Sequence, residues 1–167
     1  MAKTADPKVD FVQFLTRFPL IELPTVLGED THLIFSKENE PLTGPMIEEY
    51  ILPLEGEVDE MTEFIPCFSI PGTKTFAAVV YWKAGLLNYQ YKLLTFDEKG
   101  NFIDQKVIAG TYFNGQEMTQ SMATFTEDLQ VYIVSGQSQI ELADDYKAAT
   151  STANRLQLAS NGKIVEL

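Results

Sequence analysis

The segment from Thr75 to Gly110 constrains the fold most strongly, because it contains three consecutive runs of β-forming residues separated by short loops. The clearest loop is Asp97-Glu98-Lys99-Gly100-Asn101, which is short enough to join two neighbouring strands. Gly100 suits a left-handed backbone position, and the Asp97 side chain can accept hydrogen bonds from amides in the turn. A parallel crossover would need a dozen or more residues, so this spacing predicts an antiparallel meander.

The same two-residue periodicity begins near Thr62 and continues to the end of the chain, where Asn161-Gly162 predicts another hairpin. The strands expected after the alternating run 64–70 are 75–84, 88–96, 101–110, 118–126, 129–136, 138–143, 153–159 and 163–167. We therefore predict one α+β, mostly β domain over residues 1–167, in which residues 62–167 form a single antiparallel sheet. Such a meander can stay open or curve into a small sandwich or open barrel.

Residues 1–61 are expected to be helical and irregular, with two short helices that pack on the sheet. Asp6-Pro7 is a good helix start, and Pro19 ends the pattern. A second helix is expected from Thr43 or Gly44 until Pro53 stops it, and a short strand is expected at 31–35. The residues expected to supply much of the core of the sheet are Phe76, Ala78, Val80, Leu94, Phe96, Ile103, Val107, Phe125, Val131 and Ile133.

The charge of the chain excludes some partners. With 24 acidic and 12 basic side chains the formal net charge is −12, which argues against nucleic acid and anionic membranes. No run approaches the ~18 apolar residues of a membrane span, and the start MAKTADPKVD has no apolar signal-peptide core. We expect a soluble chain without membrane insertion. Its compartment is periplasmic or cell-surface if a native signal peptide has been removed, and otherwise cytoplasmic.

Motifs for catalysis and for cofactors are missing from the sequence. His32 is the only histidine, Cys67 is the only cysteine, and neither phosphate-binding nor dinucleotide-binding glycine patterns occur. No catalytic, cofactor-binding or metal-binding residue is therefore assigned, and no cofactor is expected. Whether the protein is an enzyme is left open, and the missing motifs favour a protein that is not an enzyme.

Two groups of residues remain as candidate contact surfaces. Trp82, Tyr89 and Tyr91 lie on adjacent predicted strands and could form an aromatic binding face for a ligand or a protein. Four carboxylates, Glu55, Glu57, Asp59 and Glu60, belong to an acidic stretch without a basic residue and could contact a cationic protein. The aromatic face is the favoured one, because exposed acidic loops commonly serve only to solubilise a protein.

The hairpin sequence YQYKLLTFDEKGNFIDQKVIAG, preceded by FAAVVYWKAG and by FLTRFPLIELP, resembles a group of uncharacterised bacterial proteins that are mostly β and are often exported or lipid-anchored. The resemblance implies a short N-terminal helix on an antiparallel sheet and implies no activity. This chain shows neither a signal peptide nor a lipidation cysteine near its start.

These observations together favour a non-catalytic module that binds an unknown protein or small molecule. The alternative function is a small hydrolase that uses carboxylates in a groove of the sheet.

Overall fold

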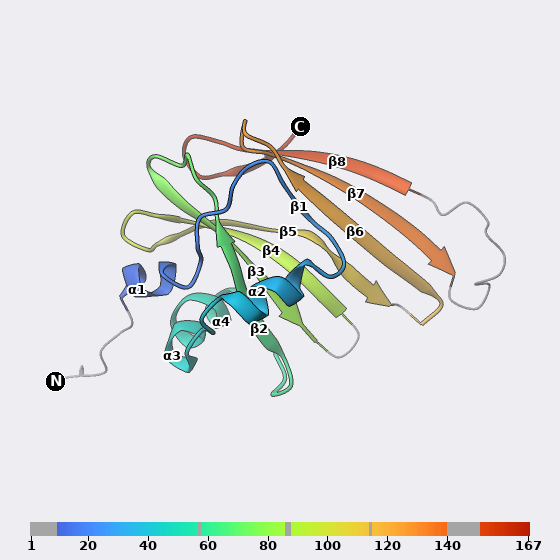
Figure 1. The fold of residues 1–167 in the computed structure, drawn as a ribbon, viewed down its shortest axis with the longest axis horizontal. Helices are drawn as coiled ribbons and strands as arrows, with labels where there is room; N and C mark the ends of the chain where they lie inside the picture. Colours follow the sequence, from blue (N-terminus) through green and yellow to red (C-terminus); the bar gives the residue numbers. More distant parts are fainter. Residues whose placement is uncertain (1–9, 57, 86–87, 114, 140–150) are drawn as a thin grey trace.

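A computed structural model describes residues 10–56, 58–85, 88–113, 115–139 and 151–167, and in these segments nine strands form one antiparallel sheet (Figure 1). Eight strands follow one another in the sheet in chain order: β2 (Glu63–Ser69), β3 (Phe76–Ala84), β4 (Asn88–Asp97), β5 (Phe102–Phe113), β6 (Glu117–Phe125), β7 (Gln130–Gln139), β8 (Ser151–Leu158) and β9 (Ile164–Glu166). The predicted α+β, mostly β class and the antiparallel meander are confirmed, and the sheet is not closed.

A ninth strand, which the sequence did not predict, comes from the N-terminal region of the chain. β1 (Thr25–Leu27) pairs with the end of β6. This edge of β6 is free because the pairing of β5 with β6 spans only Gly110 to Phe113. β5 and β6 therefore diverge, and β1 occupies the side of β6 that β5 leaves.

This divergence lets the sheet coil, so that its C-terminal strands pack over β3–β5. The Thr95 Oγ1 hydroxyl on β4 donates to the Gly162 carbonyl in the β8–β9 turn at 2.7 Å, and the Ile164 amide donates to Asp104 Oδ2 at 2.9 Å. A buried core fills the space between the two layers and includes Val80, Leu93, Phe125, Ile133 and Leu156.

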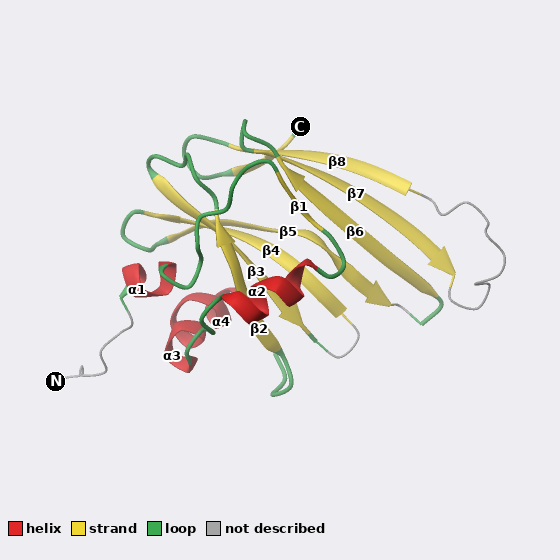
Figure 2. Ribbon diagram, viewed as in Figure 1, coloured by secondary structure: helices red, strands yellow, loops and turns green. Residues whose placement is uncertain are grey.

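The other face of β3 and β4 is covered by helices (Figure 2). The covering elements are α1 (Phe11–Leu15), α3 (Gly44–Met46), the π-helical turn η1 (Ile47–Ile51) and α4 (Leu52–Glu55). Phe14 and Ile51 from these helices are fully buried against Val79, Tyr81 and Leu94 of the sheet. Because β3 is buried on both faces, its sequence is almost continuously apolar.

Several predicted turns and caps are confirmed. Asp97 Oδ1 accepts hydrogen bonds from the amides of Lys99 and Asn101, and Gly100 has φ of 89°. Thr43 caps α3 by accepting a hydrogen bond from the Met46 amide. Helix α1 begins after Asp10, whose side chain caps it, whereas Asp6-Pro7 lies outside the described residues.

Two expectations for the N-terminal region are wrong. Residues 31–35 form the start of helix α2 (Thr31–Glu38) and not a strand, since Phe35 reaches the core from this helix while Leu33 and Ile34 stay exposed. Pro53 does not end the second helix, because the π-helical turn η1 precedes it and bonds the Leu52 amide to the Ile47 carbonyl. The helix continues as α4 until Gly56, whose φ is 75°.

The predicted core is largely confirmed, but Val107 is 44% exposed. An extra residue bulges out of β5, since Tyr91 pairs with Ala109 while Lys92 pairs with Val107. The bulge reverses the alternation and turns Ile108 inward instead. Ile103 is partly buried against the core.

Strand β7 runs unbroken across the gap expected between 129–136 and 138–143, and residues 140–150 lie outside the described chain.

Within the described residues, no helix has the length and apolar character needed to cross a membrane.

Candidate functional site

A pocket of about 620 Å³ lies on the sheet, and its floor is one face of five consecutive strands, β3 to β7. Residues directly opposite each other on antiparallel strands share a face, and so do residues two apart on one strand. The opposed pairs in the floor are Trp82 with Tyr91, Tyr89 with Thr111, Gln120 with Thr111, Met118 with Phe113, Val134 with Met122 and Gly136 with Gln120. The meander itself therefore brings these side chains together.

One wall of the pocket comes from outside the meander. Gly28, Glu29 and Asp30 connect β1 to α2, and His32 is the second residue of that helix. The side-chain amide of Asn39, just after α2, donates to two carbonyls of β2 at 2.8 Å each. These bonds satisfy two backbone carbonyl groups at the outer edge of the sheet and hold α2 beside the pocket.

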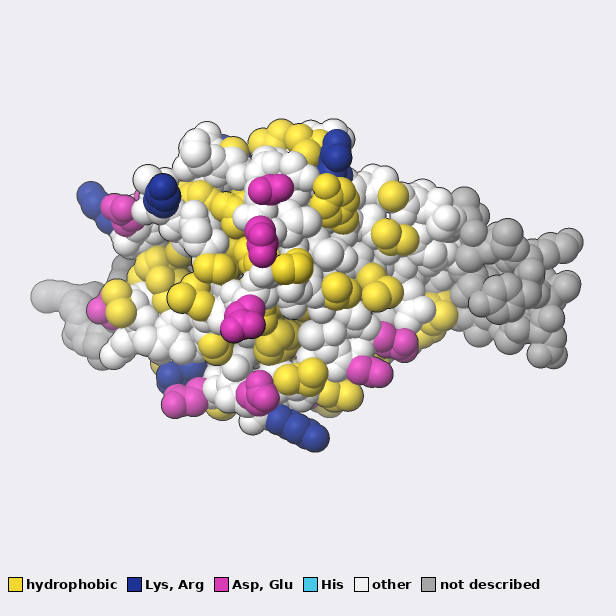
Figure 3. Space-filling model, turned by 45° about the horizontal axis from the view of Figure 1, so that its top comes forward, with side chains coloured by type: hydrophobic (Ala, Val, Ile, Leu, Met, Phe, Trp, Pro, Cys, Tyr) yellow, Lys and Arg dark blue, Asp and Glu magenta, His cyan; other side chains and the backbone are white. Residues whose placement is uncertain are grey.

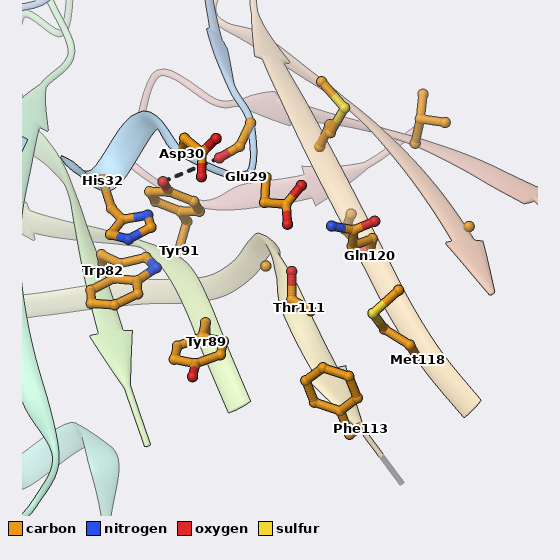
Figure 4. Close-up of a pocket in the computed structure, with 16 residues that line it drawn as sticks. Glu29, Asp30, His32, Trp82, Tyr89, Tyr91, Thr111, Phe113, Met118 and Gln120 are labelled. Carbon is orange, nitrogen blue, oxygen red and sulfur yellow. Dashed lines mark hydrogen bonds between the residues drawn. The ribbon is translucent and has the colours of Figure 1, made fainter. Parts of the chain in front are cut away.

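Three rings lie parallel along this wall. His32 stacks on Trp82 with ring centroids 4.0 Å apart, and Trp82 stacks on Tyr89 at 5.7 Å, each pair within 4° of parallel (Figure 4). Both faces of the indole are thus covered and Trp82 is only 8% exposed, so it presents its edge to the pocket. Tyr89, at the open end of the stack, is 37% exposed.

Tyr91 is buried at the back of the pocket and ties the floor to the wall. Its hydroxyl donates to the Gly28 carbonyl at 3.3 Å, the contact drawn as a dashed line in Figure 4. Burial first, and then the electrostatic effect of nearby Cys67, raise the pKa of Tyr91 above its usual value. The phenol therefore stays protonated and remains a hydrogen-bond donor at neutral pH.

Polar groups stand at the mouth of the pocket. Glu29 and Asp30 are located there, and Figure 4 shows the Glu29 side chain extending over the pocket toward Thr111 and Gln120. The apolar part of the lining includes Phe113, Met118, Met122 and Val134. The pocket therefore combines ring edges, an apolar surface and a few convergent polar groups.

The three aromatic residues singled out from the sequence, Trp82, Tyr89 and Tyr91, all line this pocket. Sequence reasoning missed the residues of β6 and β7 and the loop at Glu29 and Asp30. Alternation along β5 and β6 carries a signal for the floor, because Thr111 and Phe113 on β5, and Met118, Gln120 and Met122 on β6, occupy every second position. Nothing in the sequence indicates that the β1–α2 connection would reach this face.

The acidic residues singled out from the sequence do not form one surface. Glu55 departs most from expectation, since its side chain is only 2% exposed, and its carboxylate accepts hydrogen bonds from Tyr81, from Lys83 at 2.7 Å and from Lys92 at 2.9 Å. Asp59 accepts bonds from Met61 and Thr62 in a local turn. Glu60 is exposed, and Glu57 lies outside the described residues. On the face seen in Figure 3, acidic side chains are scattered and do not gather into one large patch.

The carboxylate of Glu55 is held in its charged form. Burial alone would raise its pKa, but hydrogen bonds from Lys83, Tyr81 and Lys92 outweigh that effect and keep the pKa below its usual value. This cluster lies under α4, on the face of β3 and β4 opposite the pocket, because Lys83 and Lys92 directly follow Trp82 and Tyr91 on alternating strands.

Two further side chains of the described chain, Cys67 and His32, carry reactive groups. The Cys67 thiol is fully buried, and burial raises its pKa, which makes it unreactive. His32 Nδ1 is buried without a hydrogen bond to a described residue. The described segments contain no group of three or more His, Cys, Asp or Glu side chains arranged to hold a metal ion.

Comparisons of the chain with protein-family models, curated proteins and solved structures found no match.

Proposed function

We propose that this protein is a non-catalytic binding module whose ligand is a small organic molecule held in the pocket over β3–β7. The observation that carries the proposal is the pocket itself, with its volume of about 620 Å³. Small-molecule sites are typically concave, mostly apolar and roughly 300–1,000 Å³ in volume, with few polar groups that orient the ligand.

The construction of the floor supports a small ligand over a protein partner. The floor is built on paired strands and backed by a core, so the apolar lining is rigid. Met122 and Val134 are each more than half exposed although they face the pocket. A ligand would cover this surface without requiring the fold to rearrange.

A substitution that fills the pocket tests the proposal. Gly136 lies on the floor, its backbone suits any residue, and a Cβ placed there meets no atom within 4 Å. Gly136→Tyr should therefore fold normally and occupy the ligand space. The matched control is Gln137→Tyr, because Gln137 is exposed and alternation places it on the opposite face of β7.

Binding can be followed at one defined atom, since Trp82 is the only tryptophan and gives a single indole N–H signal in a nitrogen–proton correlation spectrum. Titration of a library of small aromatic and aliphatic compounds should give saturable shifts of this signal in the wild type and in Gln137→Tyr. Gly136→Tyr should abolish them. Compounds should be recovered unchanged, since turnover would instead favour the hydrolase alternative. Shifts that persist in Gly136→Tyr, or no shift with any compound, would refute the proposal.

A further inference from the structure

Resting on the proposed function, we propose that the ligand is a cation: an ammonium or guanidinium group attached to a flat, apolar body. The charge pattern of the pocket points to this class. Two carboxylates, Glu29 and Asp30, stand at its mouth, and the described residues of the lining include no lysine or arginine. A ligand with one positive charge would complement this arrangement, whereas an anion would be repelled.

The segregation of basic residues strengthens the argument. The lysines nearest in sequence to the pocket rings are Lys83 and Lys92, and both turn to the opposite face of the sheet. There each is paired with the carboxylate of Glu55, at 2.7 Å and 2.9 Å. The sheet thus separates these two cations on one face from the carboxylates at the mouth on the other, and the pocket retains a negative field.

The polar groups also fit a donor-rich ligand group. When Glu29 is ionised its carboxylate only accepts hydrogen bonds, and the hydroxyl oxygen of Thr111, which points toward it in Figure 4, is a second acceptor. Gln120 lies beside these two residues and turns its side-chain nitrogen toward Glu29. An ammonium carries three donors and a guanidinium five, so either group could satisfy this set of acceptors.

The remaining surface suits a flat apolar body. In Figure 4 the ring of Tyr89, which is 37% exposed, and the side chains of Phe113 and Met118 lie below Glu29 and border the pocket there. Thioethers adapt to the shape of a bound ring, and aromatic faces attract a nearby cation. The charged group is therefore placed at Glu29, with the apolar body among Tyr89, Phe113 and Met118.

Three compounds that share one bicyclic ring test this class: the amine 2-(2-naphthyl)ethylamine, the alcohol 2-(2-naphthyl)ethanol and the carboxylate (naphthalen-2-yl)acetate. Their dissociation constants are measured from the Trp82 indole signal at low and at physiological salt. We expect the amine to bind about tenfold more tightly than the alcohol at low salt, and the carboxylate to bind most weakly. The preference should shrink at physiological salt, because Glu29 and Asp30 stand at the mouth, where salt screens their charges.

Glu29→Gln should remove most of the preference for the amine, because the affinity for the amine should fall much more than the affinity for the alcohol. The matched control is Glu127→Gln, which removes the same charge from an exposed turn between β6 and β7 that does not line the pocket. Equal binding of all three compounds, or tighter binding of the carboxylate, would overturn the cation assignment while leaving the binding function intact. If none of the three shifts the indole signal, the cation assignment fails, and the library titration separately decides whether the binding function stands.

Discussion

At the scale of single residues, Gly110 is the position on which the pocket floor depends most directly. Its φ is 143°, and a Cβ at this position would lie 2.1 Å from the Tyr89 carbonyl oxygen. Gly110→Ala should therefore destabilise the protein by about 3 kcal/mol, because strain and displacement of β4 both contribute. Chemical denaturation measures the loss, and the Trp82 indole signal should shift because Tyr89 stacks on Trp82.

The matched control is Gly136→Ala, where the added Cβ meets no atom within 4 Å and φ is unexceptional. Its stability should stay within about 0.5 kcal/mol of the wild type. If both variants were equally stable, the close approach of Gly110 to β4 would not constrain the floor.

At the scale of elements, the sheet could be predicted from the sequence more fully than the helices. Alternation and turn residues predicted the strands and the left-handed glycine at Gly100, because these signals are local and each strand pairs with its neighbour in the chain. Helix α2 and strand β1 were missed, since their positions depend on contacts with β2 and β6 that are distant in sequence. The aromatic residues of the pocket were found by the same alternation, whereas the loop at Glu29 and Asp30 gave no local signal.

The continuation of the helix past Pro53 could not be predicted from the local sequence either. It has a structural consequence. A proline in an apolar helical pattern predicts an end, but a π-helical turn admits it and adds α4. Only this extra turn places Glu55 against Tyr81, Lys83 and Lys92. We therefore expect α4 to be anchored mainly through the Glu55 carboxylate.

Glu55→Gln should lower the free energy of unfolding at pH 7 by roughly 2–4 kcal/mol, because it leaves two partly buried lysines without a counter-charge. The pKa of Glu55 is below its usual value of 4.5 in the folded protein. The stabilisation by its charge is therefore complete above about pH 4.5 and is lost as the pH falls through the lower folded pKa.

Denaturation curves from pH 7 to pH 3 measure this effect. The gap between the wild type and Glu55→Gln should narrow below about pH 4.5, whereas Glu60→Gln, at an exposed site, should track the wild type throughout. A gap that is independent of pH would show that the charge of Glu55 does not anchor α4.

At the scale of the whole molecule, the coiled sheet is secured where the β8–β9 turn meets β4. Thr95 is fully buried, and its hydroxyl donates to the Gly162 carbonyl at 2.7 Å. Thr95→Val preserves the shape of the side chain but leaves that carbonyl without this donor, which should cost about 1–3 kcal/mol. Thr152→Val, at an exposed position on β8, should change stability by less than about 0.5 kcal/mol.

Thr95→Val should nevertheless unfold in one step. The two buried clusters lie on opposite faces of the same strands, β3 and β4, so neither can lose its packing while the other keeps it. Trp82 fluorescence reports the pocket side of these strands, and far-UV circular dichroism reports the whole sheet. The two probes should give coincident transitions at a lower denaturant midpoint than the wild type. Separate transitions would mean that the β8–β9 hairpin detaches by itself and that the coil of the sheet does not belong to one cooperative unit.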